Sequence, residues 1–331
     1  MLCLRQRHAP LLQRRIRREL ATKKGVPEVT ASIELRHVSK RYDGVTAVDD
    51  LSFEVAPGRI FGLLGPNGAG KTSTLRMMLG IMLADSGTVR MFGEELGRRN
   101  LRRAGYLPEE RGLYGKMTVR ENLSFFAQLS GLDGGQAGRK AQAWCERLGI
   151  DDRLDGKVDE LSKGMQQKIQ FAAAVIHDPE FIVMDEPFTG LDPVNVNELK
   201  NVLIEFRAQG RTIVFSTHRM DQVEQLCDSI CLIDRGRCVL QGGVREIKSR
   251  YRANCVEIDC DGDGNFLENN PLVDSWNRHS DFIEVRLSAG ADPQALLRIA
   301  AAGSTVRRFE IKEPSVEQIF IDLIGKRDDG A

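Results

Sequence analysis

The chain has 331 residues, and its 47 Lys and Arg balance its 47 Asp and Glu, so the formal net charge is zero. This length predicts about two domains, and the apolar fraction of 41% is ordinary for a globular protein. No stretch approaches the roughly 18 consecutive apolar residues of a membrane span. We therefore do not expect the chain to cross a bilayer by itself, and any role at a membrane would need a partner.

Residues 1–30 form a basic arm with eight Arg or Lys against two Glu. Apolar residues are interleaved with the basic ones, a pattern compatible with a short amphipathic helix on a lipid surface or on RNA. The arm lacks the apolar core of a secretory signal. Because chain ends are commonly disordered, we favour a disordered tail, or a reading frame extended past the true start. Order is expected from near Ser32.

Two strands are expected ahead of the first motif. The segments 33–38 and 47–55 alternate between apolar and polar residues. Tyr42 lies in the turn between them. Its ring is a candidate for stacking on an adenine base, although a tyrosine taken alone would more often be a packing residue.

The run GPNGAGKTS is the motif on which the functional interpretation of the other motifs depends. Its first eight residues match the P-loop pattern, two glycines separated by four residues and followed by Lys and Thr. An apolar strand is expected at 58–64 and a helix at 73–80, which is the context that the motif requires. Lys71 would neutralise the β and γ phosphates, and Thr72 would offer its hydroxyl to Mg²⁺, while the glycines let backbone N–H groups face a polyphosphate. The predicted nucleotide-binding residues are Gly65, Pro66, Asn67, Gly68, Ala69, Gly70, Lys71, Thr72 and Ser73.

The middle of the chain is expected to be mostly helical. After a strand at 86–93, the segment 104–114 begins as a strand and becomes a loop punctuated by Pro and Gly. Apolar residues at helical spacing follow at 118–129 and 136–148. Together they predict a helical insertion at about 95–178 in an otherwise alternating α/β domain.

The run LSKGMQQ opens another helix, expected to extend to about His177. Ser162 is placed as the N-cap of this helix. The helix N-terminus behind Ser162 offers a second site for an anion. The run begins with Leu161, Ser162, Lys163, Gly164, Met165 and Gln166.

Further polar side chains follow two of the predicted apolar strands. The apolar strand 181–184 is followed by Asp185, a candidate Mg²⁺ ligand, and by Glu186, which can reach a water positioned for attack. The strand 212–216 is followed closely by His218. A lone histidine at a strand end is usually structural, but ligands bind at the carboxyl edge of open α/β sheets, where all three side chains are expected.

The rest of the first domain is expected to close by a hairpin. A turn at 188–193 leads into a helix at 196–209, and strands at 231–234 and 238–240 form the hairpin. The whole domain is predicted to span 31–247.

The chain contains seven cysteines, and three of them fall in or near this hairpin. No cysteine is paired with histidine at zinc-like spacing. We therefore interpret Cys227, Cys231 and Cys238 as small buried apolar residues of a reduced protein, in preference to metal ligands.

Residues 250–331 are predicted to form a small α+β accessory domain. This segment carries no recognisable catalytic signature, so support of a dimer or regulation is the role that we expect. The expected strands are 256–260, 282–287 and 306–311, and the expected helices are about 292–301 and 314–323.

Taken together, these motifs resemble the ATP-binding subunit of an ATP-binding-cassette (ABC) transporter, closest to the sodium- or drug-exporter-like class. The resemblance covers residues 33–245, and the extension ending at 313–320 also resembles that class. P-loops occur in kinases, GTPases and helicases, whereas LSKGMQQ before an apolar strand ending in DEP, followed by GLDP and STH, is peculiar to ABC ATPases. The implied fold is α/β: a RecA-like P-loop ABC ATPase core with an antiparallel β subdomain and a helical insertion, plus the small α+β C-terminal domain.

The resemblance implies a head-to-tail homodimer with ATP sandwiched between the P-loop of one subunit and the LSKGMQQ signature of the other. Ser162 and Gly164 would contact the γ-phosphate held by the other P-loop. Asp185 would order Mg²⁺ through water, Glu186 would be the general base, and His218 would steady the γ-phosphate and the attacking water.

The resemblance also implies partners. The cofactors would be ATP and Mg²⁺, and Asp192 would link the two ATP sites. Glu109 occupies the place of a family glutamine that senses Mg²⁺ and touches the membrane subunit. Separate integral-membrane permease subunits are expected, with no nucleic acid, and the protein would lie in the cytoplasm, peripheral on the inner face of the cell membrane.

Three residues depart from the commoner family pattern. Lys163 replaces a glycine and Met165 replaces a glutamine in the signature, and Glu109 replaces the glutamine of the coupling loop. We expect hydrolysis to be retained and the coupling to be altered.

Two other functions fit the P-loop less well. A soluble ABC ATPase acting on ribosomes or DNA would draw on the basic arm, but such proteins usually carry two cassettes or a long coiled-coil insertion. A phosphotransferase would leave LSKGMQQ and STH without a purpose.

Overall fold

The computed structural model describes residues 30–110, 112–250, 255–288, 290–312 and 314–328. The basic arm predicted at 1–30 therefore lies, except for its last residue, outside the described residues.

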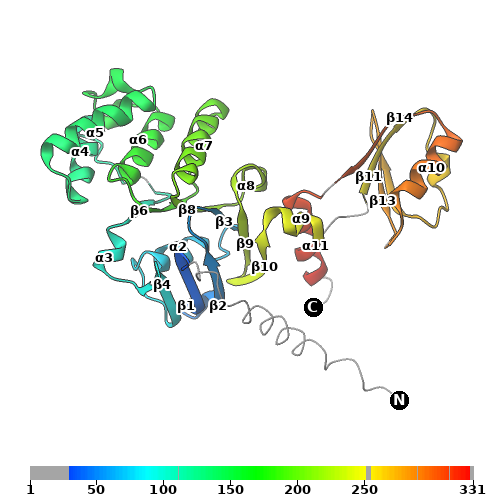
Figure 1. Cartoon of the computed structure of the whole chain (residues 1–331), viewed down its shortest axis with the longest axis horizontal. Helices are drawn as coiled ribbons and strands as arrows, with labels where there is room; N and C mark the ends of the chain where they lie inside the picture. Colours follow the sequence, from blue (N-terminus) through cyan, green and yellow to red (C-terminus); the bar gives the residue numbers. More distant parts are fainter. Residues whose placement is uncertain (1–29, 111, 251–254, 289, 313, 329–331) are drawn as a thin grey trace, which may run out of the picture. The chain divides into compact units, whose positions relative to one another are not determined.

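The core is a six-stranded sheet in the order β10-β9-β3-β8-β7-β6 (Figure 1). All neighbouring strands in it are parallel except β10, which pairs with β9 in antiparallel fashion. Every residue of β3, β7 and β8 is buried, as expected for parallel strands covered on both faces. The strands are β3 (Ile60–Leu64), β6 (Ala104–Leu107), β7 (Phe181–Asp185), β8 (Thr212–Thr217), β9 (Ser229–Asp234) and β10 (Arg237–Gly243).

A second, antiparallel sheet has the order β2-β1-β4-β5. Its apolar side shares one core with the six-stranded sheet, and the rings of Phe53 and Phe61, one from each sheet, stack with centroids 5.1 Å apart. Helix α2 (Lys71–Met78) contributes to the same core and begins two residues earlier than the predicted start at Ser73. The strands are β1 (Ile33–Tyr42), β2 (Val45–Val55), β4 (Ser86–Met91) and β5 (Glu94–Glu95).

Three helices, α4, α5 and α6, lie together beside the core sheet (Figure 1). Thr118 and Glu121 form a reciprocal capping box at the start of α4. Although β6 falls in the range expected for the helical insertion, it pairs with β7 in the core sheet, so the all-helical segment begins at α4. The helices are α3 (Arg98–Leu101), α4 (Val119–Leu129), α5 (Gly134–Arg147), α6 (Lys163–Val175) and two 3₁₀ turns, η1 (Asp151–Arg153) and η2 (Val158–Glu160).

An aromatic cluster packs helices α5 and α6 of the helical segment against helix α7 (Pro193–Ala208). The rings of Trp144, Phe171 and Phe206 lie within 6.0 to 6.4 Å of one another, on α5, α6 and α7. Rings at this separation add attraction beyond their burial. The domain is completed by α8 (Met220–Leu226) and α9 (Val244–Arg250).

The C-terminal segment builds an antiparallel sheet in the order β12-β13-β11-β14 with its own apolar core. The final helix, α11, instead contacts α8, and its Val316 and Ile319 are buried in the same core as residues of β3, β7 and β8. The accessory segment predicted at 250–331 therefore packs in two places. Its elements are β11 (Cys255–Cys260), η3 (Asn265–Leu267), β12 (Val273–Arg278), β13 (Ile283–Leu287), α10 (Pro293–Gly303), β14 (Val306–Lys312) and α11 (Val316–Asp328).

Candidate nucleotide-binding site

The P-loop connects the end of β3 to the start of α2. Gly70 has a φ of 102°, and a Cβ at this position would lie 2.2 Å from the carbonyl oxygen of Ala47. A Cβ on Gly65 would lie 2.1 Å from the carbonyl oxygen of Ile233. Only glycine fits at either position, so neighbouring strands hold the loop closely from two sides.

Lys71 is the buried cation of the loop. Its Nζ donates hydrogen bonds to the carbonyl oxygens of Gly65 at 2.8 Å and Pro66 at 3.1 Å. Burial lowers the pKa of Lys71 below its ordinary value, and the carboxylates of Glu186, Asp185 and Glu109 oppose that shift. The ammonium group therefore faces three acids, and a polyphosphate would compete for it.

A cavity of about 400 Å³ brings the predicted residues together. It joins the P-loop to Glu109 and to Asp185 and Glu186 at the end of β7, as the sequence predicted. The predicted ATP-binding and catalytic residues that do not line it are Tyr42, Gly65, Pro66, Ala69 and His218. Ala47, which contributes from β2, was not predicted. The cavity is lined by Ala47, Asn67, Gly68, Gly70, Lys71, Thr72, Ser73, Glu109, Asp185 and Glu186.

Asp185 has one carboxylate oxygen without a protein partner. Its Oδ1 accepts a hydrogen bond from the Ser216 hydroxyl, whereas its Oδ2 is buried and has no hydrogen-bond partner among the described residues. A buried unpaired carboxylate oxygen is costly. A hard divalent cation prefers such an oxygen, and the Thr72 hydroxyl lines the same cavity. The residues present therefore fit Mg²⁺.

Glu186 is held in place by the last residue of β8 and by the residue that follows it. Its Oε1 accepts from the His218 backbone N–H at 3.1 Å and lies 2.8 Å from His218 Nδ1, and its Oε2 accepts from the Thr217 hydroxyl at 3.2 Å. Glu186 also has a φ of 48°, the left-handed region that a glutamate rarely adopts. Such backbone strain is concentrated at functional sites. The structure thus brings His218 to Glu186, while half of the imidazole stays exposed.

The signature residues lie at the start of α6. Ser162 is the N-cap, and its Oγ accepts from the Met165 N–H at 3.2 Å. Gln166 donates to the carbonyl oxygens of Val158 and Leu161, both at 3.0 Å. Ser162 and Lys163 are exposed, and no signature residue lines the cavity that holds the P-loop. Within one chain, the structure does not bring the two motifs together.

Two glutamines of α6 connect the signature to the cavity, and sequence reasoning did not assign them a role. Gln170 Nε2 donates to the carbonyl oxygens on either side of Glu109, those of Pro108 at 3.0 Å and Glu110 at 2.9 Å. Gln167 Nε2 donates to the Pro187 carbonyl at 3.2 Å, next to Glu186. Their spacing of one and two helical turns after Ser162 could have indicated that they share its side of α6. The carbonyl groups that they bind belong to distant segments of the sequence, so these hydrogen bonds could not be predicted.

Two further predicted residues have local contacts. Asp192 caps α7: its Oδ1 accepts from the N–H groups of Asn195 and Val194, both at 3.0 Å, and these bonds lower the pKa of its carboxyl group. Tyr42 ends β1, and its hydroxyl lies 3.3 Å from the Ser73 Oγ. The Tyr42 hydroxyl is therefore beside the P-loop helix, and stacking of its ring on adenine stays a prediction.

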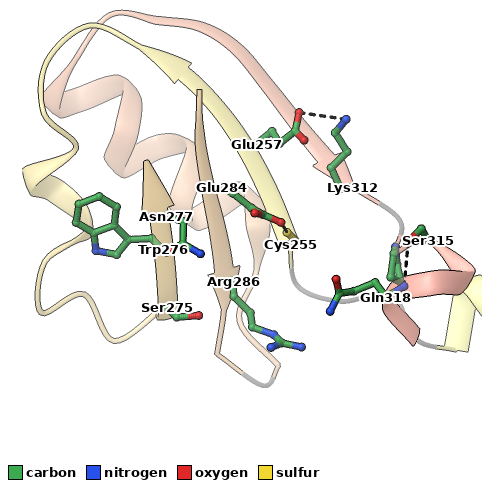
Figure 2. Close-up of a pocket in the computed structure, with 11 residues that line it drawn as sticks. Cys255, Glu257, Ser275, Trp276, Asn277, Glu284, Arg286, Lys312, Ser315 and Gln318 are labelled. Carbon is green, nitrogen blue, oxygen red and sulfur yellow. Dashed lines mark hydrogen bonds and ion pairs between the residues drawn. The ribbon is translucent and has the colours of Figure 1, made fainter. Parts of the chain in front are cut away.

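A second cavity opens on the outer face of the C-terminal sheet (Figure 2). Charges of both signs line it, and Lys312 pairs with Glu257 at 3.1 Å. Arg308 pairs with the same Glu257 at 3.3 Å. Because these acids and bases neutralise one another, the face is an ordinary solvated side of a sheet, and we assign it no ligand.

The family model for ABC transporters matches residues 48–189, and the model for the C-terminal domain of DrrA1-3-like ATP-binding proteins matches 242–324. An uncharacterized ABC transporter ATP-binding protein, YhaQ of Bacillus subtilis, is 41% identical over 88% of this chain and 98% of its own length. The chain belongs to the ABC transporter ATP-binding proteins. The ABC subunit is also 41% identical to the Nod factor export ATP-binding protein I of Burkholderia pseudomallei, over 89% of this chain and 98% of that protein.

Solved structures agree with this assignment. The ATP-binding subunit of another ABC transporter aligns with a TM-score of 0.62 and 30% identity, covering 66% of this ABC subunit and 92% of that chain. CbiO1 of Clostridium perfringens, part of the transporter complex cbiONQ, aligns with a TM-score of 0.59 and 25% identity, covering 66% and 91%. Among the described residues of the ABC subunit, no helix is both long and apolar enough to cross a bilayer.

Proposed function

We propose that this ABC subunit hydrolyses ATP to drive export through separate integral-membrane permease subunits. The observation that carries the proposal is the single cavity in which Lys71, Asp185 and Glu186 meet, with Glu186 clamped by His218. A buried cation for phosphate, an unpaired carboxylate oxygen for a metal and a positioned base are the parts that phosphoryl transfer to water requires.

The residues divide the chemistry among themselves. The P-loop N–H groups and Lys71 bind the phosphates. Thr72, Asp185 and Glu109 would hold Mg²⁺, which when bound neutralises negative charge on the β and γ phosphates. Glu186 accepts the proton of the attacking water on its carboxylate. His218 keeps that carboxylate aimed at the water and steadies the γ-phosphate.

A second copy of the chain completes each site. The α6 N-terminus with Ser162 and Gly164 is outside the cavity of its own chain, and its N–H groups and small Gly164 suit it to cover a triphosphate. Two copies arranged head to tail would bury two ATP molecules, with Asp192 linking the sites. Cleavage leaves like charges on ADP and phosphate, which would loosen the dimer and let a coupled partner move.

The surface offered to a permease lies on the helical segment. The rings of Tyr114, Phe125 and Phe126 form a cluster with centroids 5.3 to 6.3 Å apart, and Tyr114 is 51% exposed. Gln170 ties the nearby Glu109 loop to α6, so a force on this loop reaches the signature helix. The name of the Nod factor export relatives suggests that the direction of transport is export. The ABC subunit would then lie on the cytoplasmic face of the membrane, without a nucleic-acid partner.

Affinity purification of tagged Glu186→Gln protein from its own cells, in mild detergent and with ATP, tests this function. We expect stoichiometric recovery of a polypeptide with several apolar spans. The matched variant that also carries Tyr114→Asp should bind ATP equally well and lose that polypeptide. Recovery of ribosomes or nucleic acid, with no such polypeptide, would contradict the transport function.

A further inference from the structure

Two cysteine thiols face each other across the β9–β10 hairpin. The Sγ atoms of Cys231 and Cys238 are 3.5 Å apart, and the Cys231 thiol donates to the Cys238 sulfur. Cys231 is fully buried, whereas Cys238 is partly exposed. The described residues contain no group of three or more metal-ligating side chains, so the pair has no third ligand to make it a metal site.

The two sulfurs are chemically unequal. The hydrogen bond from Cys231 lowers the pKa of the Cys238 thiol, burial opposes this shift, and a backbone contact with Leu240 adds to it. The same hydrogen bond, together with burial, raises the pKa of Cys231. The thiolate is the reactive form of cysteine. Cys238 is therefore the nucleophile that a small oxidant would meet, and Cys231 is the neighbour that can resolve the product.

The hairpin that carries this pair supports the P-loop. Cys231 on β9 is paired in register with Leu63 on β3, two residues before the loop begins. At the hairpin turn, the Gly236 N–H donates to the carbonyl oxygen of Ala69 in the P-loop at 3.0 Å. The Gly236 carbonyl accepts from the Asp49 N–H at 2.9 Å. A change of hairpin geometry would thus reach the phosphate-binding backbone directly.

We propose that Cys231 and Cys238 form a reversible disulfide in response to hydrogen peroxide, and that this disulfide weakens ATP binding. The Cys238 thiolate attacks the peroxide, the O–O bond breaks, and with one proton taken up the products are a sulfenic acid and water. The Cys231 sulfur then attacks the sulfenic sulfur and releases a second water. Overall, two thiols are oxidised by two electrons and the peroxide is reduced to two waters.

Disulfide formation requires a movement of the hairpin that would alter the P-loop. The sulfurs must approach from 3.5 Å to about 2.05 Å, the length of a disulfide bond. Because Cys231 lies in the sheet beside β3, most of the movement falls on β10 and on the turn that contains Gly236. The hydrogen bond from Gly236 to Ala69 is then displaced, and the P-loop loses part of its support.

Peroxide treatment of the full chain, followed by peptide mass analysis and an ATP-binding titration, tests the proposal. We expect one linked peptide pair, lighter by two hydrogen atoms, that joins Cys231 to Cys238. We also expect ATP affinity to fall by about tenfold, within the usual range of coupling between sites, and to recover with dithiothreitol. No such link would overturn the redox site, and a link with unchanged affinity would overturn its coupling to the P-loop.

Three variants separate this pair from the other cysteines. Cys238→Ser should keep its ATP affinity after peroxide. Cys231→Ala should stop at a sulfenic acid on Cys238 that dimedone traps. Cys255→Ser, which removes another partly buried thiol outside the hairpin, should still respond as the unaltered protein does. An undiminished response in Cys238→Ser, or its loss in Cys255→Ser, would contradict the assignment.

Discussion

Glu186 owes its position to hydrogen bonds that arrive from a neighbouring strand. Its carboxylate is held by Thr217 and His218, and its backbone N–H donates to Ser216 at 3.2 Å. Ser216 and Thr217 at the end of β8, together with His218 directly after it, thus orient Glu186, which follows β7. The DEP and STH runs predicted a meeting at this sheet edge, but the clamp itself depends on the register of β7 against β8.

Glu186→Gln should keep nucleotide affinity and lose turnover. The amide preserves the shape and most of the contacts but accepts no proton, so we expect a fall of about 10²- to 10⁴-fold in ATPase rate. Phosphate release measures the rate, and a fluorescent ATP analogue measures the affinity. The control is Glu54→Gln, an exposed position on β2, and a rate near that of the control would remove Glu186 from its role.

Lys71→Ala should weaken ATP binding itself, because it removes the cation that faces the cavity. Burial lowers the pKa of Lys71 from 10.5, so the unaltered side chain loses its proton at a lower pH than an exposed lysine does. Lys71 should therefore be fully protonated near neutral pH, where ATP affinity should be highest. The affinity should decline as the pH rises toward that lowered pKa. Titrations across this range check both points. Lys116→Ala, at an exposed position, is the control, and equal affinities in the two variants would refute the phosphate role.

At the scale of the element, α6 shows what local sequence can and cannot predict. Ser162 was predicted as its N-cap because a short polar side chain precedes an apolar helical pattern, and the structure confirms this cap. Strand β12 (Val273–Arg278) was missed because its sequence is mostly polar and exposed, and α8 (Met220–Leu226) was missed because a seven-residue helix leaves little periodicity. Tertiary packing decides such short elements.

Removing the two N-caps should separate a structural effect from a functional one. Ser162→Ala and Thr118→Ala each remove a side-chain acceptor at a helix start, so each should cost about 1 kcal/mol of stability. Only Ser162→Ala should also lower ATPase activity, because Ser162 would contact the γ-phosphate held by the second chain, whereas the Thr118 hydroxyl caps its own helix. Urea unfolding and phosphate release measure the two effects. Similar activity losses in both variants would mean that Ser162 acts only as a cap.

At the scale of the whole molecule, the last helix belongs to the nucleotide-binding core. The side chain of Glu224 on α8 accepts from the Val316 N–H and pairs with Lys248 on α9 at 2.8 Å. The sequence predicted a helix here but assigned it to the accessory domain. Its apolar residues do not reveal which of two cores they join, so that assignment needed the tertiary structure.

Ile319→Ala should destabilise the nucleotide-binding domain although the residue lies near the C-terminus. Ile319 is 1% exposed in the main core, and such a truncation costs about 2 to 5 kcal/mol. Ile321→Ala on the same helix, where the side chain is 53% exposed, should change stability little. Denaturant unfolding followed by bound nucleotide reports on this domain. Equal stabilities for the two variants would contradict the docking of α11.

The completion of each ATP site by a second chain is the central claim, since the signature lies outside its own P-loop cavity. Sedimentation of Glu186→Gln protein, with and without Mg²⁺ and ATP, tests it most directly because hydrolysis cannot reopen the closed state. We predict a monomer without nucleotide and a dimer with it, and a monomer in both conditions when Ser162→Arg is added. A Glu186→Gln protein that binds ATP and stays monomeric, or a dimer that Ser162→Arg leaves intact, would contradict the account.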